Sequence, residues 1–236
     1  MATKRRFGVS TRLYEGKRLG RDHLLEVAAH GFDIVEIPAV RTHLDFANPA
    51  VVANLQQWLA EARIDLHGLH VPAGAPAADG DEALLVARRI PMQVLAVRVA
   101  KLREGANAIE RLAEDAAPLG VTIAVDSNSD ALTPIGSLVH FVEGFDARIG
   151  IAFDCASVKR PGELADAIEM ASEHLVTMRV PVESRIDWAS ALTTVQKVGY
   201  EGPLIVDPPP RTSTKEMLKL ARAARERFEK QLCTFI

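Results

Sequence analysis

The chain has 236 residues, of which 48% are hydrophobic and 25% charged, and its formal net charge at pH 7 is −3. This is an ordinary globular composition, and the slightly negative charge gives no general attraction for nucleic acid or anionic lipid. The basic first residues lead into a strand-like segment without the apolar stretch of a signal peptide, and no later run reaches transmembrane length. We therefore expect a cytoplasmic protein. Cys155 and Cys233 lack the paired spacing of a thiolate zinc site or a disulfide framework.

No glycine-, serine- or proline-rich stretch divides the chain, so we expect residues 1–236 to form one domain. Short runs rich in Val and Ile alternate with helical patterns, which is typical of βα units around a parallel sheet. The expected strands lie at 7–10, 33–37, 64–70, 94–99, 121–126, 148–154, 175–180 and 204–207. Eight such units predict an α/β fold, a compact (β/α)8 TIM barrel with short loops. An open doubly wound sheet is the alternative, but it normally has fewer strands and often a glycine-rich first turn.

The clearest helical patterns span 21–30, 49–63, 104–117, 162–174 and 188–198, and a basic last helix follows along 215–230. Gly31, Gly120 and Gly199 each stand just past a helical pattern, where a left-handed residue closes the last turn. Asp187 is placed to cap the seventh helix. No glycine-rich phosphate-binding motif follows a strand, so a nucleotide site has no motif behind it.

The alternation of side chains along each strand predicts which residues line the inside of the barrel. In the fifth strand the apolar residues suit the helix side, which places Asp126 inside. By the same argument, Asp154 and Asp207 end the sixth and eighth strands on the inward side. The carboxyl ends of barrel strands form the catalytic face, so these three carboxylates should share one rim. Like charges there would raise at least one pKa unless a cation lies nearby.

Seven segments along essentially the whole chain share a pattern with known barrels: GVST at 8–11, AAHGFDIVE at 28–36, HVP at 70–72, VTIAVD at 121–126, IGIAFD at 149–154, IDW at 186–188 and GYEGPLIVD at 199–207. In this order they resemble the sugar phosphate isomerase/epimerase family of xylose isomerase-like TIM barrels, which also includes endonuclease IV-like proteins. In that family Glu, Asp, His and Glu hold one divalent cation, which polarises a sugar-like substrate during proton transfer. The resemblance implies a sugar-like small-molecule substrate and a divalent metal such as Mg, Mn or Zn.

The chain departs from the family's metal site at several positions. Asp126 and Asp207 stand where the family usually has Glu, which shortens each reach by one methylene. Ala156 and Ser157 stand where a His often follows the family's Asp, and the loop 181–185, where the family usually supplies a metal-binding His, contains none. The resemblance therefore implies a degenerate metal site.

Two arginines offer a physical explanation for the missing histidines. Arg98 and Arg179 should point inward, because their apolar neighbours on the fourth and seventh strands, Val176 among them, suit the helix side. One hypothesis is that these arginines supply the charge of the metal by pairing with the carboxylates, so that no cofactor is needed. The competing hypothesis keeps a divalent cation on the three aspartates, with His70 as a further ligand. A salt-bridged rim without catalysis is the alternative to both.

Other residues near the rim are candidates with ordinary alternatives. Glu36 is expected to end the second strand and to face inward. Its candidate roles are a general base, a partner of a substrate hydroxyl or a member of a structural ion pair. His43, in the following loop, can close over a substrate or belong to a plain surface loop. Trp188 can stack on a sugar ring or pack in the core. Arg211 could grip a phosphate, although the glycines usual in such a barrel site are missing.

These arguments define one set of candidate site residues. The candidate catalytic residues are Glu36, His70, Arg98, Asp126, Asp154 and Arg179, the candidate substrate-binding residues are His43, Trp188, Asp207 and Arg211, and the candidate metal ligands are Asp126, Asp154 and Asp207.

The expected function is an isomerase or epimerase acting on a sugar, sugar phosphate or keto acid, with a carboxylate that transfers a proton. The alternative is a non-catalytic barrel that binds a small polyhydroxylated or acidic ligand. A DNA-repair endonuclease ranks last, because it needs a His-rich metal cluster and a basic groove. We expect no nucleic-acid or membrane partner, and a homo-oligomer is left open.

Overall fold

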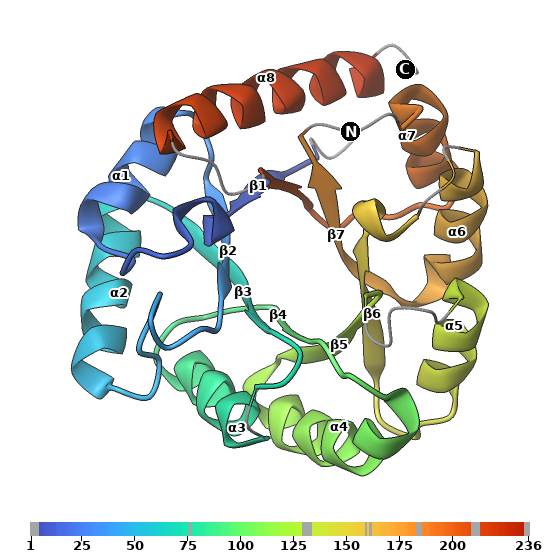
Figure 1. Ribbon diagram of the computed structural model, residues 1–236, viewed down its shortest axis with the longest axis horizontal. Coiled ribbons are helices and arrows are strands. Elements are labelled where there is room, and N and C mark those ends of the chain that lie inside the picture. The colour runs from blue at the N-terminus through green and yellow to red at the C-terminus, as the bar shows by residue number, and fades with distance from the viewer. Residues whose placement is uncertain are drawn as a thin grey trace.

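The computed structural model of the protein describes residues 5–75, 77–128, 134–158, 160, 162–182, 186–208 and 213–233. Within these residues eight parallel strands close into a barrel in the order β1 to β8, with the helices outside (Figure 1). The strands are β1 (Phe7–Ser10), β2 (Ile34–Pro38), β3 (Asp65–Val71), β4 (Val94–Val97), β5 (Thr122–Asp126), β6 (Ile149–Asp154), β7 (Leu175–Pro181) and β8 (Leu204–Asp207). The helices are α1 (Arg21–Ala29), α2 (Pro49–Ala62), α3 (Ala77–Leu85), α4 (Leu102–Ala116), α5 (Ile135–Glu143), α6 (Glu163–Ala171), α7 (Trp188–Lys197) and α8 (Thr214–Cys233). The predicted (β/α)8 barrel is confirmed.

The local signals at the helix ends act as the sequence predicts. Gly31, Gly120 and Gly199 adopt φ values of +82°, +70° and +70°, a conformation that costs glycine little because it has no Cβ. The side chain of Asp187 accepts the backbone N–H of Ala189 at the start of α7. These short stops return the chain quickly to the next strand, which keeps the loops compact.

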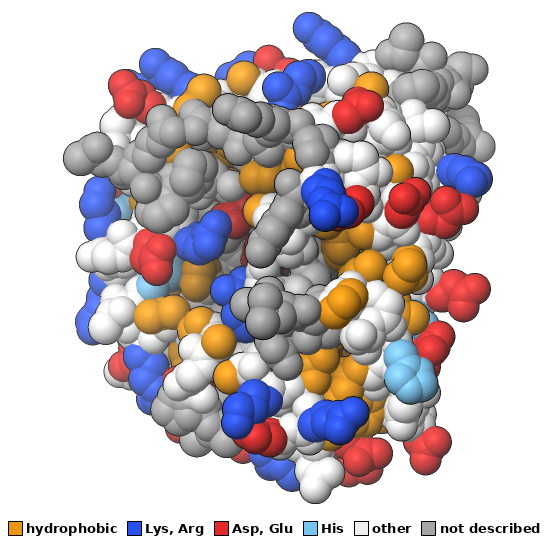
Figure 2. Space-filling view, turned by 45° about the vertical axis from the view of Figure 1, so that its right-hand side comes forward, with side chains coloured by type: hydrophobic (Ala, Val, Ile, Leu, Met, Phe, Trp, Pro, Cys, Tyr) orange, Lys and Arg blue, Asp and Glu red, His pale blue; other side chains and the backbone are white. Residues whose placement is uncertain are grey.

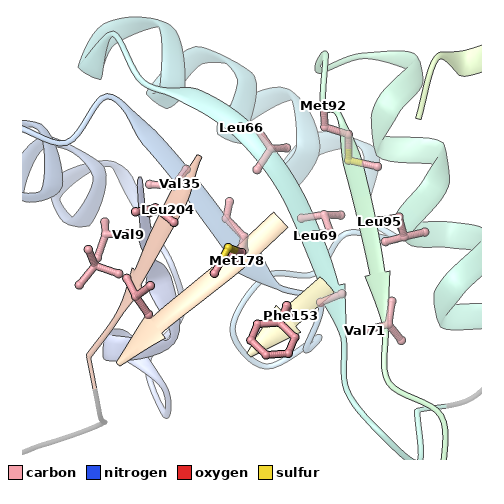
Figure 3. Packing of buried hydrophobic residues seen from close by; sticks show 14 of the residues in the cluster. Val9, Val35, Leu66, Leu69, Val71, Met92, Leu95, Phe153, Met178 and Leu204 are labelled. Carbon is pink, nitrogen blue, oxygen red and sulfur yellow. The ribbon is translucent and has the colours of Figure 1, made fainter. Parts of the chain in front are cut away.

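The barrel wall has one apolar layer on its outer side and another on its inner side. The larger fills the space between the strands and the helices, and Figure 3 shows part of it, with Leu95 and Phe153 among its members. The smaller layer lies inside the barrel and consists of Val94, Ala96, Ala124 and Ala152. Because most of these inner side chains are small, the barrel has room for longer polar side chains near the carboxyl ends of its strands.

A register shift between β6 and β7 corrects one detail of the predicted alternation. Ala152 lies opposite Thr177, so Val176 is the extra residue of a bulge. The simple alternation predicted that Val176 would face the helices. In the structure it packs against the inner apolar layer instead. Gly150 accommodates it, because a Cβ there would lie 2.5 Å from Val176 Cγ1. Beyond the bulge the alternation recovers, and Arg179 points inward as expected.

The outer surface carries both signs of charge. On the face drawn in Figure 2, basic and acidic side chains lie mixed and do not gather into one basic patch. No described helix combines the length and apolar character needed to cross a membrane.

Candidate functional site

A cavity of about 230 Å³ opens among the carboxyl ends of the strands and the loops that follow them. Its charged or titratable lining includes Arg12, Glu36, His70, Arg98, Arg179 and Asp207. Larger hollows lie at the amino ends of the strands and beside α5 and α6. The catalytic groups of (β/α)8 enzymes lie at the carboxyl ends of the strands. The hollow beside α5 and α6 also reaches the ends of β5 and β6, but of these three only the smaller cavity is lined by Glu36, His70 and Asp207 from inside the barrel, so it is the candidate site.

Arg179 of β7 is the centre of a buried charge cluster. Its Nε donates to Glu36 Oε1 of β2 at 2.6 Å, and its Nη1 donates to Asp126 Oδ2 of β5 at 2.7 Å. The side chains of Arg179, Glu36 and Asp126 are 5%, 4% and 0% exposed. Burial alone would lower the pKa of Arg179, but the two carboxylates outweigh burial and raise it. The cluster therefore contains a permanent cation that connects three strands across the barrel.

Asp126 is surrounded by further donors. Arg98 Nη2 lies 3.4 Å from Oδ1 and 3.3 Å from Oδ2, and the backbone N–H of Asn128 donates to Oδ1 at 2.7 Å. His70 Nε2 lies 2.8 Å from Oδ2, although the oxygen is off the direction of a good hydrogen bond. Burial would raise the pKa of Asp126, but the imidazole and the two guanidinium groups hold it well below its usual range. Asp126 is therefore a fixed carboxylate beneath the cavity.

His70 lies one residue before the end of β3 and lines the cavity. Burial lowers its pKa, the charge of Arg179 lowers it further, and the contact with Asp126 only partly opposes both. The imidazole is therefore neutral at pH 7 and can act as a hydrogen-bond donor or acceptor in the cavity wall.

A second ion pair lies at the rim of the cavity. Arg12, in the 3-10 turn after β1 (Thr11–Tyr14), donates from Nε to Asp207 Oδ1 at 3.1 Å and from Nη2 to Oδ2. Arg12 is 42% exposed, whereas Asp207 at the end of β8 is 8% exposed. Burial raises the pKa of Asp207 to about 6, although Arg12 opposes the shift. Asp207 can therefore change its charge near neutral pH.

Asp154 has different partners from the other two aspartates. Its Oδ2 accepts from Asn128 Nδ2 at 2.7 Å, and its Oδ1 accepts from the backbone N–H of Ala156 at 2.9 Å. The hydroxyl groups of Ser127 and Ser157 bind its backbone. Within the described residues, amides and hydroxyls hold Asp154, and a guanidinium does not.

The described residues do not fit a divalent metal. Across the ranges given above, no three His, Cys, Asp or Glu side chains are grouped so that they could hold an ion. Guanidinium nitrogens take the oxygens of Asp126 and Asp207, and amide nitrogens take those of Asp154. These donors occupy directions from which a hard cation would bind oxygen. The three aspartates end their strands at the same end of the barrel, and each carboxylate has its own hydrogen-bond donors.

His43 lines the cavity, but both of its ring nitrogens form hydrogen bonds to residues at the rim. Its Nε2 lies 3.1 Å from Thr11 Oγ1, and its Nδ1 lies 2.9 Å from the carbonyl oxygen of Lys17. Because a carbonyl can only accept, Nδ1 carries the proton, and burial lowers the pKa of the ring. His43 thus connects two ends of the segment that carries Arg12.

The remaining candidates lie elsewhere. Trp188 is buried with its ring centroid 4.9 Å from that of Phe228 of α8, so it is a core residue and the expectation that it binds substrate is not supported. Cys155 is buried, and burial raises the pKa of its thiol, as suits a structural cysteine. Arg211 lies outside the described residues. Sequence reasoning missed Arg12, whose signal is its position two residues after the end of β1.

No family model and no curated protein matches the sequence. Among solved structures, D-psicose 3-epimerase from Clostridium cellulolyticum H10 with D-tagatose has a TM-score of 0.80 at 18% identity, covering 96% of this chain and 99% of that chain. An L-ribulose 3-epimerase has a TM-score of 0.78 at 18% identity, covering 98% and 95% of the two chains. A xylose isomerase-like TIM barrel protein from Mycobacterium smegmatis in complex with magnesium has a TM-score of 0.78 at 11% identity, covering 97% and 98%.

The chain is therefore a (β/α)8 barrel with a charged cavity at the carboxyl ends of its strands. More narrowly, it has the fold of the xylose isomerase-like TIM barrels, which confirms the resemblance at the level of the fold. At these identities the likeness establishes the fold alone, and function must be argued from the site.

Proposed function

We propose that the protein is an isomerase or epimerase that transfers a proton on a small sugar, sugar phosphate or keto acid. The observation that carries the proposal is the cavity itself, where the carboxyl groups of Glu36 and Asp207 face the same space as Arg12, Arg98 and Arg179. The fold shared with sugar 3-epimerases supports the same reaction class.

The chemistry requires a base and a positive charge. Removing a proton next to a carbonyl group produces an enediolate, whose oxygen must be stabilised where its charge develops. We assign the proton transfer to Glu36 and Asp207, because both carboxyl groups reach the cavity from strands on either side of β1. Asp207, with its pKa raised to about 6, is suited to take up and return a proton near neutral pH.

The positive charge is assigned to the guanidinium groups of Arg98 and Arg179. The donors in the cavity do not fit a divalent cation, so no step is routed through a metal. Asp126 positions both arginines from below, and neutral His70 offers a hydrogen bond to the substrate from β3. Asp154 supports the neighbouring loop through Asn128.

Hydrogen exchange between substrate and solvent tests the proposal directly. The protein is incubated in deuterium oxide with aldoses, ketoses, their phosphates and keto acids, and NMR follows deuterium incorporation and product formation. Glu36→Gln should lower kcat by about a hundredfold or more, the usual contribution of a general base. The matched control is Glu226→Gln, at an exposed ion pair on α8 that should leave exchange unchanged.

Two outcomes would contradict the proposal in different ways. Absence of exchange with every compound in the panel would refute an isomerase or epimerase. Elemental analysis that finds a stoichiometric divalent metal, whose removal abolishes exchange, would refute the assignment of the positive charge to the arginines.

One observation favours a second candidate, a barrel that binds a small polyhydroxylated or acidic ligand without chemistry. Arg179 already pairs with Glu36 and Asp126, as in a structural salt-bridge network. Ligand-induced thermal stabilisation without deuterium exchange would support this alternative.

A further inference from the structure

We infer that the ligand of the cavity carries a carboxylate, which binds Arg98 and Arg179. The inference rests on the proposed function, because it concerns the same site, and it narrows the substrate class to its acidic members, small sugar-like keto acids. Two observations carry it: the incomplete pairing of Arg98, and a donor on each arginine that has no acceptor among the described residues.

Arg98 is less completely paired than its neighbour. Its contacts with the oxygens of Asp126 are 3.3 and 3.4 Å, beyond the usual range of a hydrogen bond, whereas Arg179 holds the same carboxylate at 2.7 Å. Arg179 also takes Glu36 at 2.6 Å. The side chain of Arg98 is 27% exposed. Its only ion-pair partner among the described residues is Asp126, which Arg179 binds at a shorter distance.

Both arginines also have a donor without an acceptor. Arg98 Nε and Arg179 Nη2 are buried and have no hydrogen-bond partner among the described residues. Buried polar groups in native structures are nearly always paired, so such atoms call for an explanation. Both side chains line the cavity, and a ligand that brings acceptor oxygens there would satisfy them after a small movement.

A carboxylate fits these donors better than a hydroxyl group does. Its two coplanar oxygens match the fork of guanidinium nitrogens, and charge-assisted hydrogen bonds are about twice as strong as neutral ones. The carboxyl groups in contact with Arg12 and Arg179 are already paired, which limits their repulsion of an incoming anion.

Calorimetry with pairs of ligands that differ only in the acid group tests the inference. The probes are D-erythronate against erythritol and D-ribonate against ribitol, four- and five-carbon chains with and without the carboxylate. We expect each acid to bind at least about tenfold more tightly than its polyol, and more weakly as salt is raised. Equal affinity for acid and polyol, or no binding of either acid at millimolar concentration, would overturn the inference.

Substitution of Arg98 locates the binding group. Arg98→Gln should weaken binding of D-erythronate by about tenfold or more, whereas Arg222→Gln, the same change on the exposed face of α8, should have no effect. Arg98→Lys keeps the charge without the fork and should fall between them, which preserves the test if Arg98→Gln does not fold. Binding of D-erythrose 4-phosphate in place of both acids would also overturn the assignment to a carboxylate.

The two proposals fail differently. Acids that bind through Arg98 without deuterium exchange would leave this inference standing and refute the isomerase. Exchange confined to neutral sugars would support the isomerase and refute the carboxylate.

Discussion

The buried cluster around Arg179 and the rim pair of Arg12 and Asp207 use the same chemical groups with opposite results. In the cluster, the pKa of Asp126 is held well below its usual range, although this side chain is the more deeply buried of the two aspartates. At the rim, the pKa of Asp207 is raised to about 6 despite an arginine in direct contact. Burial pushes both pKa values upward, so burial alone does not explain the difference.

The difference follows from the number of donors and their exposure. Two guanidinium groups, an imidazole and a backbone N–H surround Asp126, and most of them are shielded from water. Asp207 faces one arginine whose side chain is 42% exposed, so water screens much of that charge. The barrel thus has one carboxylate of fixed charge and one that titrates near neutral pH.

The largest expected effect comes from removing the cation of the buried cluster. Arg179→Met leaves Glu36 and Asp126 buried without their shared partner, and breaking a buried ion pair on one side typically costs about 3–5 kcal/mol. Urea unfolding followed by circular dichroism measures the loss of stability. Arg222→Met, at an exposed pair on α8, should change stability by less than about 0.5 kcal/mol. A loss below about 1 kcal/mol for Arg179→Met would show that the cluster is not the electrostatic centre of the barrel.

The next effect has the opposite sign. Asp207 has a folded pKa of about 6, above the unfolded value of about 3.9, so its charged form costs stability above pH 6 and this cost disappears as the pH falls below about 4. A shift of two units corresponds to nearly 3 kcal/mol, reduced because Arg12 loses an ionic partner. Asp207→Asn should therefore stabilise the protein by about 2 kcal/mol at pH 8 and hardly at all at pH 4. Denaturant titrations at the two pH values measure the gain, and equal effects at both would contradict the raised pKa.

The two regions were not equally predictable from the sequence. Strand ends and inward positions follow from local alternation of apolar residues, so Arg98, Arg179 and Asp126 could be placed together before the structure was known. The partners of Asp207 could not be foreseen in the same way, because Arg12 lies in a turn after β1, where no periodicity fixes the direction of a side chain. Its contact depends on how β1 and β8 pair and on the anchor that His43 provides.

The register shift and the separation of the aspartates have a similar cause. Alternation describes one strand, but the bulge at Val176 is a property of the β6–β7 pair, and a local pattern of Val and Met gives no sign of it. Asp126, Asp154 and Asp207 are all last residues of strands at inward-facing positions. The sequence does not say which hydrogen-bond donor contacts each carboxylate. Charge pairing between distant strands is a tertiary property, and it decided the chemistry of this rim.

A smaller effect is expected at the bulge, where Gly150 leaves space for Val176 inside the barrel below the buried cluster. In Gly150→Ala the new Cβ would meet Val176 Cγ1 at 2.5 Å, and overpacking of this kind costs about 1–3 kcal/mol. Because the two contacts below 3.0 Å are both with the Val176 side chain, and the backbone oxygen of His174 lies at 3.2 Å, adding Val176→Ala should recover most of the loss. Unfolding of the single and double variants measures both effects, and no recovery in the double variant would place the strain in the backbone instead.

The smallest effect should separate the rim from the cluster. His43→Gln removes hydrogen bonds to Thr11 and Lys17 and should cost about 1 kcal/mol, while the turn that carries Arg12 loosens. Because Arg12 opposes the raised pKa of Asp207, a looser Arg12 should raise that pKa further, and the pH at which the fall in stability levels off should move upward from about 6. Denaturant titrations across pH 5–8 detect this movement, with His140→Gln on the exposed face of α5 as the control. An unchanged pH dependence in His43→Gln would mean that Arg12 stays on Asp207 without His43, and that the rim pair is as firmly held as the buried cluster.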